Sequence, residues 1–313
     1  MPETLRIVFM GTPEFAVPCL KVLHNSRHEL SLVVAQPDRP KGRGRKVLPG
    51  AVKQAAVEMG LDVIQPVSFK DETVAKTLAS TAPDLFVVVA YGLILPGRIL
   101  SIPKRGAVNI HPSLLPKYRG PSPIQWAIVN MEKETGVTSI FMDEGMDSGD
   151  IILSYTEPIS ETDTAADLHD RLALRGADLL LRTLELIEHD TVNAVPQDHS
   201  KATFAPLLKK EHGKIDWNQP AVKLRRFVNG MTPWPGAYTF LDGRRYRLLE
   251  VEPVSLAKTS RPGTVVGAFP GELVVAASEG GVSIKRIQAE SAKPLPIEDF
   301  LRGHTIPEGA VFS

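Results

Sequence analysis

The chain has 313 residues, more than the roughly 100 to 200 residues of a common single domain, so its length favours two domains. Hydrophobic residues make up 43% of the sequence, a usual share for a globular protein that argues against disorder. The apolar runs are far shorter than the roughly 20 residues of a membrane span, and Glu3 precedes the first of them. We therefore expect neither a membrane span nor a signal peptide.

The cysteine, histidine and charged residues indicate the compartment and the kinds of ligand that this protein can have. The single cysteine, Cys19, cannot form an internal disulfide, which fits a reducing cytoplasm, and we interpret it as a buried apolar residue. The eight histidines follow no metal-ligand spacing, so we expect no metal. The formal net charge is zero, but residues 209–313 carry 15 Lys and Arg against 11 Asp and Glu. The C-terminal third is therefore a candidate surface for nucleic acid.

In the first two thirds of the chain, apolar runs alternate with helical patterns. The run from Leu5 to Met10 ends at Gly11, and Thr12 as N-cap with Pro13 predicts the start of a helix. Further strands are predicted at 30–35, 62–65, 85–91, 107–111 and 137–142, and helices at 13–23, 50–60, 71–81, 122–130 and 164–188. This alternation predicts an α/β domain with a Rossmann-like, doubly wound, mostly parallel sheet covered on both faces.

In the last third of the chain the pattern changes to short predicted strands separated by turn sequences. Strands are predicted at 237–241, 245–251, 264–269, 273–277 and 282–287, with Asp242-Gly243 as a tight turn. Such spacing predicts a small antiparallel β-barrel of the OB-like kind. We predict a catalytic domain at 1–189, a polar linker at 190–208 and an RNA-binding barrel domain at 209–313. Trp217 and Trp234 are predicted to lie in a core or domain interface.

The most informative stretch runs from Asn109 to Gly120, at the carboxyl end of a predicted strand. Ligands of open α/β sheets bind beyond these strand ends, and residues two apart on a strand, such as Asn109 and His111, point to the same face. Pro112 removes a backbone N–H here, so side chains must supply the donors. A carboxamide beside an imidazole suits stabilisation of the oxyanion that forms when an amine attacks a carbonyl.

A second polar stretch, Met142 to Asp150, follows the next predicted strand. Its glycines permit a tight loop that presents Asp147 to the same crevice. An aspartate beside His111 would favour the imidazolium and help an attacking amine to lose its proton. Each residue also has a simpler interpretation: Asn109 as a turn former, His111 as a hydrogen-bonded core residue and Asp147 as a loop cap. The residue types by themselves leave both interpretations open.

Several motifs together resemble those of the folate-dependent formyltransferase family. They are Asn109-x-His111, Ser113-Leu-Leu-Pro116, Tyr118-Arg-Gly120, Met142-Asp143 and Asp147-Ser-Gly-Asp150. Within that family, a further set is similar to the members that formylate initiator methionyl-tRNA: Phe9-x-Gly11-Thr-Pro13-x-Phe15-Ala16, Gln36-Pro-Asp-Arg-Pro40 and Pro233-Trp-Pro235. The resemblance runs from about residue 5 to the C-terminus. One departure is Pro112, where many relatives carry glycine.

The resemblance implies a donor, an acceptor and a set of site residues. The donor would be 10-formyltetrahydrofolate, and the acceptor the amino group of initiator methionyl-tRNA, bound by its acceptor stem to a cytoplasmic protein that we expect to be a monomer. The catalytic trio would be Asn109, His111 and Asp147. Folate would bind to Ser113, Leu114, Leu115, Pro116, Val89, Tyr91, Gly92 and Leu93, and tRNA to the basic loop of Arg39, Lys41, Arg43, Arg45 and Lys46.

The composition of the basic loop also supports nucleic-acid binding, independently of the resemblance. It places five cations in eight positions, and Gly42 and Gly44 between them suit a loop that adapts to a phosphate backbone. A merely solvated loop is the alternative.

Three other functions stay open at this point. A formyltransferase or hydrolase for a small molecule would leave the basic loop and the C-terminal third unexplained. An oxidoreductase is disfavoured because the turn after the first strand, Gly11-Thr-Pro-Glu-Phe15, lacks Gly-x-Gly-x-x-Gly. A non-catalytic RNA-binding module would leave Asn109, His111 and Asp147 without a role.

Overall fold

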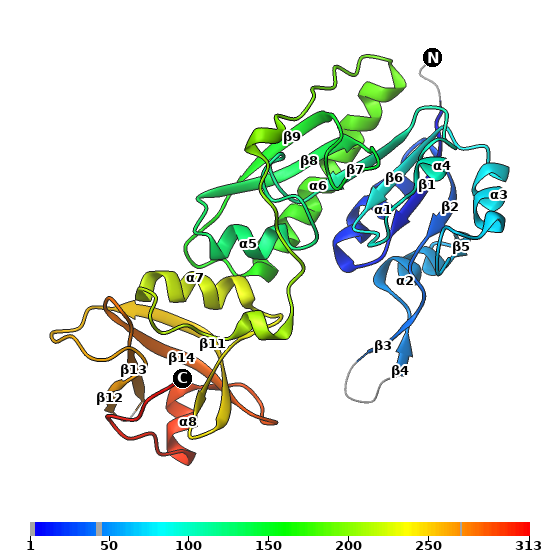
Figure 1. The fold of residues 1–313 in the computed structure, drawn as a ribbon. Helices are drawn as coiled ribbons and strands as arrows, with labels where there is room; N and C mark the ends of the chain where they lie inside the picture. Colours follow the sequence, from blue (N-terminus) through cyan, green and yellow to red (C-terminus); the bar gives the residue numbers. More distant parts are fainter. Residues whose placement is uncertain (1–3, 42–45, 270) are drawn as a thin grey trace. The chain divides into compact units, whose positions relative to one another are not determined.

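The chain divides into two compact units (Figure 1). A computed structural model describes residues 4–41, 46–269 and 271–313. Unit 1 comprises Met1–Pro123, Glu134–Pro158 and His169–Pro206, and unit 2 comprises Ile124–Lys133, Ile159–Leu168 and Leu207–Ser313. Neither unit is one continuous stretch of chain. The predicted domain limits of 1–189 and 209–313 stay a prediction.

Unit 1 is built on a seven-stranded sheet in the order β5-β2-β1-β6-β7-β8-β9. The strands are β1 (Arg6–Gly11), β2 (Glu29–Val34), β5 (Val63–Ile64), β6 (Leu85–Val89), β7 (Ala107–His111), β8 (Glu134–Phe141) and β9 (Ile151–Pro158). The first five pair in parallel, and β8 and β9 are antiparallel. The predicted Rossmann-like, mostly parallel sheet is confirmed.

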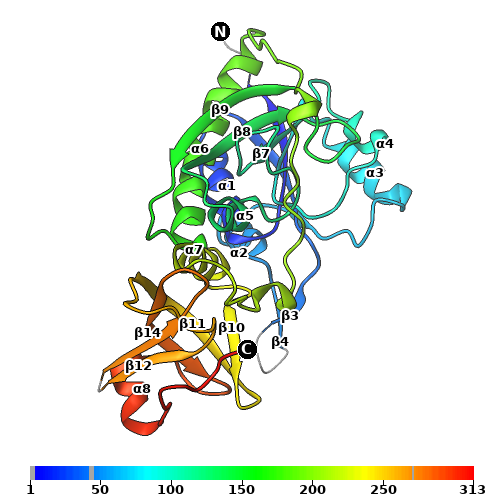
Figure 2. The same cartoon turned by 60° about the vertical axis from the view of Figure 1, so that its left-hand side comes forward.

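Helices cover both faces of this sheet (Figure 2). On one face lie α1 (Val17–His24), α2 (Ala51–Glu58) and the long α6 (Ala165–Glu188); on the other lie α3 (Glu72–Ser80) and α4 (Gly97–Leu100). Gly176 lets α6 approach closely, because a Cβ there would lie 3.1 Å from Ile110 of β7 and 3.9 Å from Cys19 of α1. Leu78 of α3 and Ile99 of α4 share a core with alternate residues of β1, β2 and β6.

The start of the first helix differs from its prediction. Pro13 precedes a 3-10 turn, η1 (Glu14–Ala16), which leads into α1, and Thr12 caps neither element. The Thr12 hydroxyl instead donates to the carbonyl of Tyr91 at 3.1 Å. The predicted N-cap is wrong because this hydroxyl meets a carbonyl beyond the neighbouring strand β6, a contact that local sequence does not reveal.

Unit 2 is built on an antiparallel sheet in the order β10-β11-β14-β13-β12, and β15 pairs with β14. The strands are β10 (Ala237–Leu241), β11 (Arg244–Val254), β12 (Val265–Phe269), β13 (Glu272–Ala276), β14 (Gly281–Ala289) and β15 (Leu295–Pro296). Asp242 and Gly243 both have positive φ, 50° and 73°, as a tight two-residue hairpin turn requires. The antiparallel prediction is confirmed.

The C-terminal segment joins the two edges of this sheet. The backbone N–H of Phe240 on β10 donates to Ser313 at 3.0 Å, and that of Val265 on β12 donates to Ala310 at 2.8 Å. Both edge strands therefore find partners in the same short segment, which leaves fewer unpaired backbone groups at the sheet edges. The sheet also packs with α7 (Ala221–Met231) and α8 (Ile297–Gly303).

Two short segments from earlier in the chain belong to unit 2. They include most of α5 (Pro123–Val129) and the start of α6. The buried guanidinium of Arg226 on α7 donates to the carbonyl of Ser160 at 2.7 Å and to that of Glu132 at 3.1 Å. One side chain thus ties both segments to α7.

The two tryptophans behave differently. Trp217 is buried and its indole N–H donates to the hydroxyl of Thr239 at 3.0 Å, which confirms its prediction as a core residue. Trp234 is 49% exposed. Its prediction as a core residue is wrong, because the turn between α7 and β10 leaves the indole largely in solvent, and its place in a domain interface stays a prediction.

No helix among the described residues combines the length and the apolar character that a bilayer crossing requires.

The thiol of Cys19 offers a test of the core. It is fully buried on α1, and burial raises its pKa to about 12. Because the thiolate is the nucleophile, the folded protein at about pH 8 presents a protonated, inert thiol. We expect iodoacetamide to leave the native protein unmodified and to label it in denaturant, where the pKa returns to about 8.5. Intact-mass spectrometry reads both states, and equal labelling rates would contradict the packing.

Candidate active site

A pocket of about 490 Å³ opens beyond the carboxyl ends of β1, β6 and β7. This is where open α/β sheets bind their ligands. Asn109, Ile110 and His111 of β7 all line it, and the Ile110 side chain also lies close to Gly176 of α6. The rest of the wall comes from Val88 of β6 and the turn after β6, from Ile140 of β8 and the loop after β8, and from Pro13, Pro112, Gly120, Pro121 and Pro123.

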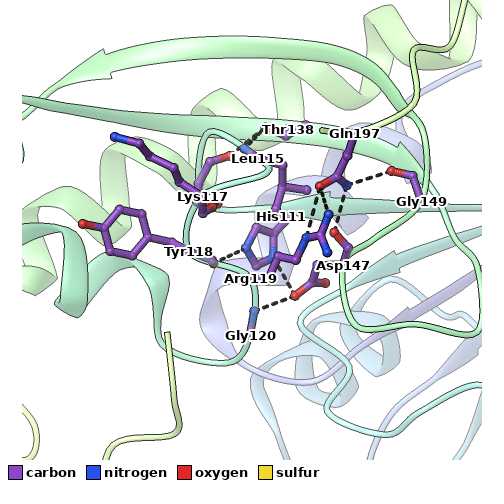
Figure 3. Close-up of polar contacts among 11 residues, drawn as sticks. His111, Leu115, Lys117, Tyr118, Arg119, Gly120, Thr138, Asp147, Gly149 and Gln197 are labelled. Atoms are coloured by element: carbon purple, nitrogen blue, oxygen red, sulfur yellow. Dashed lines mark hydrogen bonds and ion pairs between the residues drawn. The ribbon is translucent and has the colours of Figure 1, made fainter. Parts of the chain in front are cut away.

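His111 is buried, and its ring lies between the backbone carbonyl of Tyr118 and the carboxylate of Asp147 (Figure 3). Its Nε2 lies 2.9 Å from the carbonyl oxygen of Tyr118. A carbonyl only accepts, so Nε2 carries a proton and donates. Nδ1 lies 3.6 Å from Oδ2 of Asp147. Nδ1 is therefore the ring nitrogen that faces the Asp147 carboxylate.

Asp147 lies on the loop between β8 and β9. Its φ is +51°, in the left-handed region, and its Oδ2 accepts the backbone N–H of Gly120 at 2.7 Å. The loop itself is closed by Asp143, which accepts from the Ser148 hydroxyl at 2.8 Å. A Cβ at Gly149 would lie 1.8 Å from the carbonyl of Phe141, so this turn requires glycine. The loop-capping carboxylate is thus Asp143, and Asp147 faces His111.

The carboxamide of Asn109 is free to bind a ligand. Asn109 lies in the middle of β7 rather than in a turn, and it is half-buried at the pocket wall. Within the described part of the chain its side chain has no hydrogen-bond partner, although neighbouring polar groups are paired. A half-buried amide without a partner at a pocket wall is a good donor for an oxyanion.

Two family models match the chain in sequence. One, described as formyl transferase, covers residues 5–184, and the other, described as the C-terminal domain of formyl transferase, covers residues 207–305. The chain belongs to the formyl transferase family. Two of its relatives are methionyl-tRNA formyltransferases: that of Alkaliphilus oremlandii is 43% identical over 98% of this chain and 99% of its own, and that of Pelotomaculum thermopropionicum is 46% identical over 98% of both.

Two solved structures share the fold of this chain. The N-formyltransferase of Helicobacter canadensis, in complex with folinic acid and dTDP-3-aminofucose, matches 93% of this chain and all of its own with a TM-score of 0.67 at 17% identity. HypX of Aquifex aeolicus, in complex with tetrahydrofolic acid, matches 99% of this chain and 51% of its own with a TM-score of 0.64 at 19% identity.

The residues predicted to bind folate lie partly at the pocket. Tyr91, Gly92 and Leu93 line it, with Ala90, while Val89 is buried in β6. Ser113, Leu114, Leu115 and Pro116 do not line it. The Ser113 hydroxyl donates to the carbonyl of Lys117 at 2.7 Å, and the Thr138 hydroxyl donates to the Ser113 carbonyl at 2.7 Å. These bonds hold the segment behind His111, where it shapes the turn leading to Tyr118. Its folate role stays a prediction.

The two ends of the predicted basic loop are short strands that pair with each other. β3 (Arg39–Lys41) pairs antiparallel with β4 (Lys46–Leu48), and the backbone of Lys41 is in register with that of Lys46. Arg43 and Arg45 lie outside the described residues. The Arg39 guanidinium donates to the Gln36 side-chain oxygen at 2.6 Å, and the Gln36 amide donates to the Tyr91 carbonyl at 2.9 Å. The base of the hairpin is thus connected to a pocket-lining turn.

Across the described ranges, no group of three or more His, Cys, Asp or Glu side chains is placed to hold a metal ion.

Gln197 was not among the predicted site residues. It lies in the segment predicted as a linker, yet it is buried in unit 1 and donates to the carbonyls of Asp147 and Gly149. A single glutamine in a polar segment carries no motif, so only its contacts reveal it.

Proposed function

We propose that this protein transfers the formyl group of 10-formyltetrahydrofolate to the amino group of the methionyl moiety of initiator methionyl-tRNA, for translation initiation. The observation that carries the reaction type is the convergence of Asn109, His111 and Asp147 on one pocket. The acceptor is supported by relatives of that name that match 98% of the chain.

The three side chains divide the chemistry between them. When the amine attacks the formyl carbon, a C–N bond forms and the carbonyl oxygen gains charge, which the Asn109 carboxamide stabilises by donating a hydrogen bond. Nδ1 of neutral His111 takes the proton that the amine loses, and Asp147 stabilises the resulting imidazolium. The proton then passes to the folate nitrogen as its bond to the formyl carbon breaks. His111 returns to its neutral form.

The pocket suits the donor. Apolar side chains such as Val88, Leu95 and Ile140 supply walls for a flat ring, and the turn through Tyr91 and Gly92 presents backbone along one side. Small-molecule sites commonly combine apolar walls with a few backbone hydrogen-bonding groups. We propose that folate lies against this turn, with its formyl group toward Asn109.

The hairpin is proposed to bind phosphates of the acceptor stem. We expect Lys41→Ala combined with Lys46→Ala to raise KM for methionyl-tRNA and to lower the slope of log affinity against log salt by about one for each lost phosphate contact. The turnover at saturating tRNA should stay unchanged. Steady-state kinetics at several salt concentrations measure this, with Lys70→Ala combined with Lys76→Ala as the control of equal charge. An unchanged salt slope would exclude the hairpin from the RNA site.

The test of the function is transfer of radiolabelled formyl by the purified protein. The acceptors offered together are methionyl-tRNA, glycinamide ribonucleotide, a nucleotide-linked amino sugar and water. Selective labelling of the tRNA supports the proposal. Labelling of a small acceptor would keep the chemistry of the trio and overturn the RNA acceptor, and binding of tRNA without transfer would leave an RNA-binding module.

We further propose that the protein works in the cytoplasm as a monomer that needs no metal and no membrane. Its single cysteine is buried, which fits a reducing compartment. Light scattering of the purified protein tests the oligomeric state.

A further inference from the structure

Arg119 and Gln197 form a buried polar pair beside the catalytic residues. Each side chain is buried, and neither lines the pocket. Within the described ranges no carboxylate lies within ion-pair distance of the Arg119 guanidinium. Burying a charged guanidinium without a counter-ion costs free energy. The burial of Arg119 therefore calls for an explanation in the contacts that it makes.

The Gln197 carboxamide joins Arg119 to the loop that carries Asp147 (Figure 3). Its oxygen accepts from Arg119 Nη2 at 2.6 Å and from Nε at 3.2 Å. Its NH₂ group donates to the Asp147 carbonyl at 2.9 Å and to the Gly149 carbonyl at 2.8 Å. Both donors and the acceptor are used, so the amide has one orientation only.

Arg119 lies between the two backbone groups that hold the catalytic side chains. The carbonyl before it, of Tyr118, accepts from His111, and the N–H after it, of Gly120, donates to Asp147. Its own backbone is also fixed, because its N–H donates to the carbonyl of Thr203 at 2.9 Å. Displacement of Arg119 therefore moves both contacts together.

The loop needs such support. Asp147 has a left-handed backbone conformation, which costs energy for a residue other than glycine and persists only where the surroundings impose it. The two carbonyls held by Gln197 stand on either side of Ser148, at the turn where this conformation occurs. The amide thus fixes the backbone from which the Asp147 carboxylate projects.

We propose that Arg119 and Gln197 are positioning residues that set the separation of His111 Nδ1 and Asp147 Oδ2. The proposal rests on the proposed function, because it assigns the pair a part in the same proton transfer. Misplacement of a reacting group by about 1 Å can cost on the order of 10²-fold in rate.

The decisive variant is Gln197→Glu. Its carboxylate still accepts from Arg119 and gives the guanidinium a counter-ion, but it has no N–H for the carbonyls of Asp147 and Gly149. We expect kcat to fall on the order of 10²-fold, with KM for folate and for tRNA near the wild-type values and the melting temperature retained. Gln197→Met, which loses both sets of bonds, should lose as much kcat and melt lower.

A second measurement does not depend on turnover. Hydrogen exchange resolved to single amides should show that Gly120 loses its protection in both Gln197 variants, since its acceptor on Asp147 has moved. Thr183→Val is the control: it removes a buried hydroxyl that donates to the Leu179 carbonyl at 2.8 Å and to the Ser139 hydroxyl at 2.9 Å, and neither Thr183 nor Ser139 lines the pocket. It should leave kcat and the Gly120 amide unchanged.

The outcomes separate cleanly. Wild-type kcat in Gln197→Glu, or an unchanged Gly120 amide in that variant, would overturn the proposal and leave the pair a purely structural role. If the wild-type protein formylates no methionyl-tRNA, the proposed function fails, while the exchange data still decide whether the pair holds the loop.

Discussion

His111→Gln is expected to lower kcat by roughly 10²- to 10⁴-fold, the usual worth of general acid–base catalysis. Glutamine can place an amide N–H close to the position of Nε2, so the bond to the Tyr118 carbonyl is kept and packing changes little. It has no group that gains or loses a proton opposite Asp147, where Nδ1 now lies 3.6 Å away. Single-turnover transfer from 10-formyltetrahydrofolate to methionyl-tRNA measures the chemical step.

The matched comparison for this variant is Thr183→Val. Both substitutions alter one buried polar side chain of unit 1, but only His111 borders the pocket. Retained folate binding and a native melting transition would show that His111→Gln is folded. A folded variant with nearly normal turnover would remove His111 from the proton transfer.

The second large effect is expected at Asn109. Asn109→Ala should lower kcat by roughly 10²- to 10³-fold, the cost of losing one oxyanion donor. Stability should hardly change, because the carboxamide has no hydrogen-bond partner in the described part of the chain and is already half-buried at the pocket wall. Stopped-flow kinetics and a denaturant titration together test both halves of the prediction.

The double variant Asn109→Ala with His111→Gln shows whether the two residues serve one transition state. When two groups act as a unit, the fold-loss of kcat in the double variant is far smaller than the product of the two single fold-losses. We expect this smaller loss for the double variant. Fully multiplicative losses would mean that Asn109 and His111 act in separate steps, and a strong loss of stability in Asn109→Ala would point to a structural role instead.

Much of the fold follows from local pattern. Apolar runs that alternate with helical stretches require strands buried on both faces, and the chain indeed forms a seven-stranded, mostly parallel sheet. Turn chemistry is equally local: Asp242-Gly243 permits positive φ, and a two-residue hairpin turn occurs there. The start of α1 was predicted wrongly, because the Thr12 hydroxyl bonds to Tyr91, far away in the chain.

The sequence by itself determined the candidate site residues: Asn109 and His111 are two apart on a strand, so they share a face, and the family motif adds Asp147. Only the tertiary structure decided how they are held. His111 takes its tautomer from the Tyr118 carbonyl, and Asp147 is oriented by Gly120. Gln197, distant in the chain and without a motif, secures the loop. The physical reason is that a hydrogen bond forms between groups that are close in space, whereas a sequence pattern describes only residues that are close along the chain.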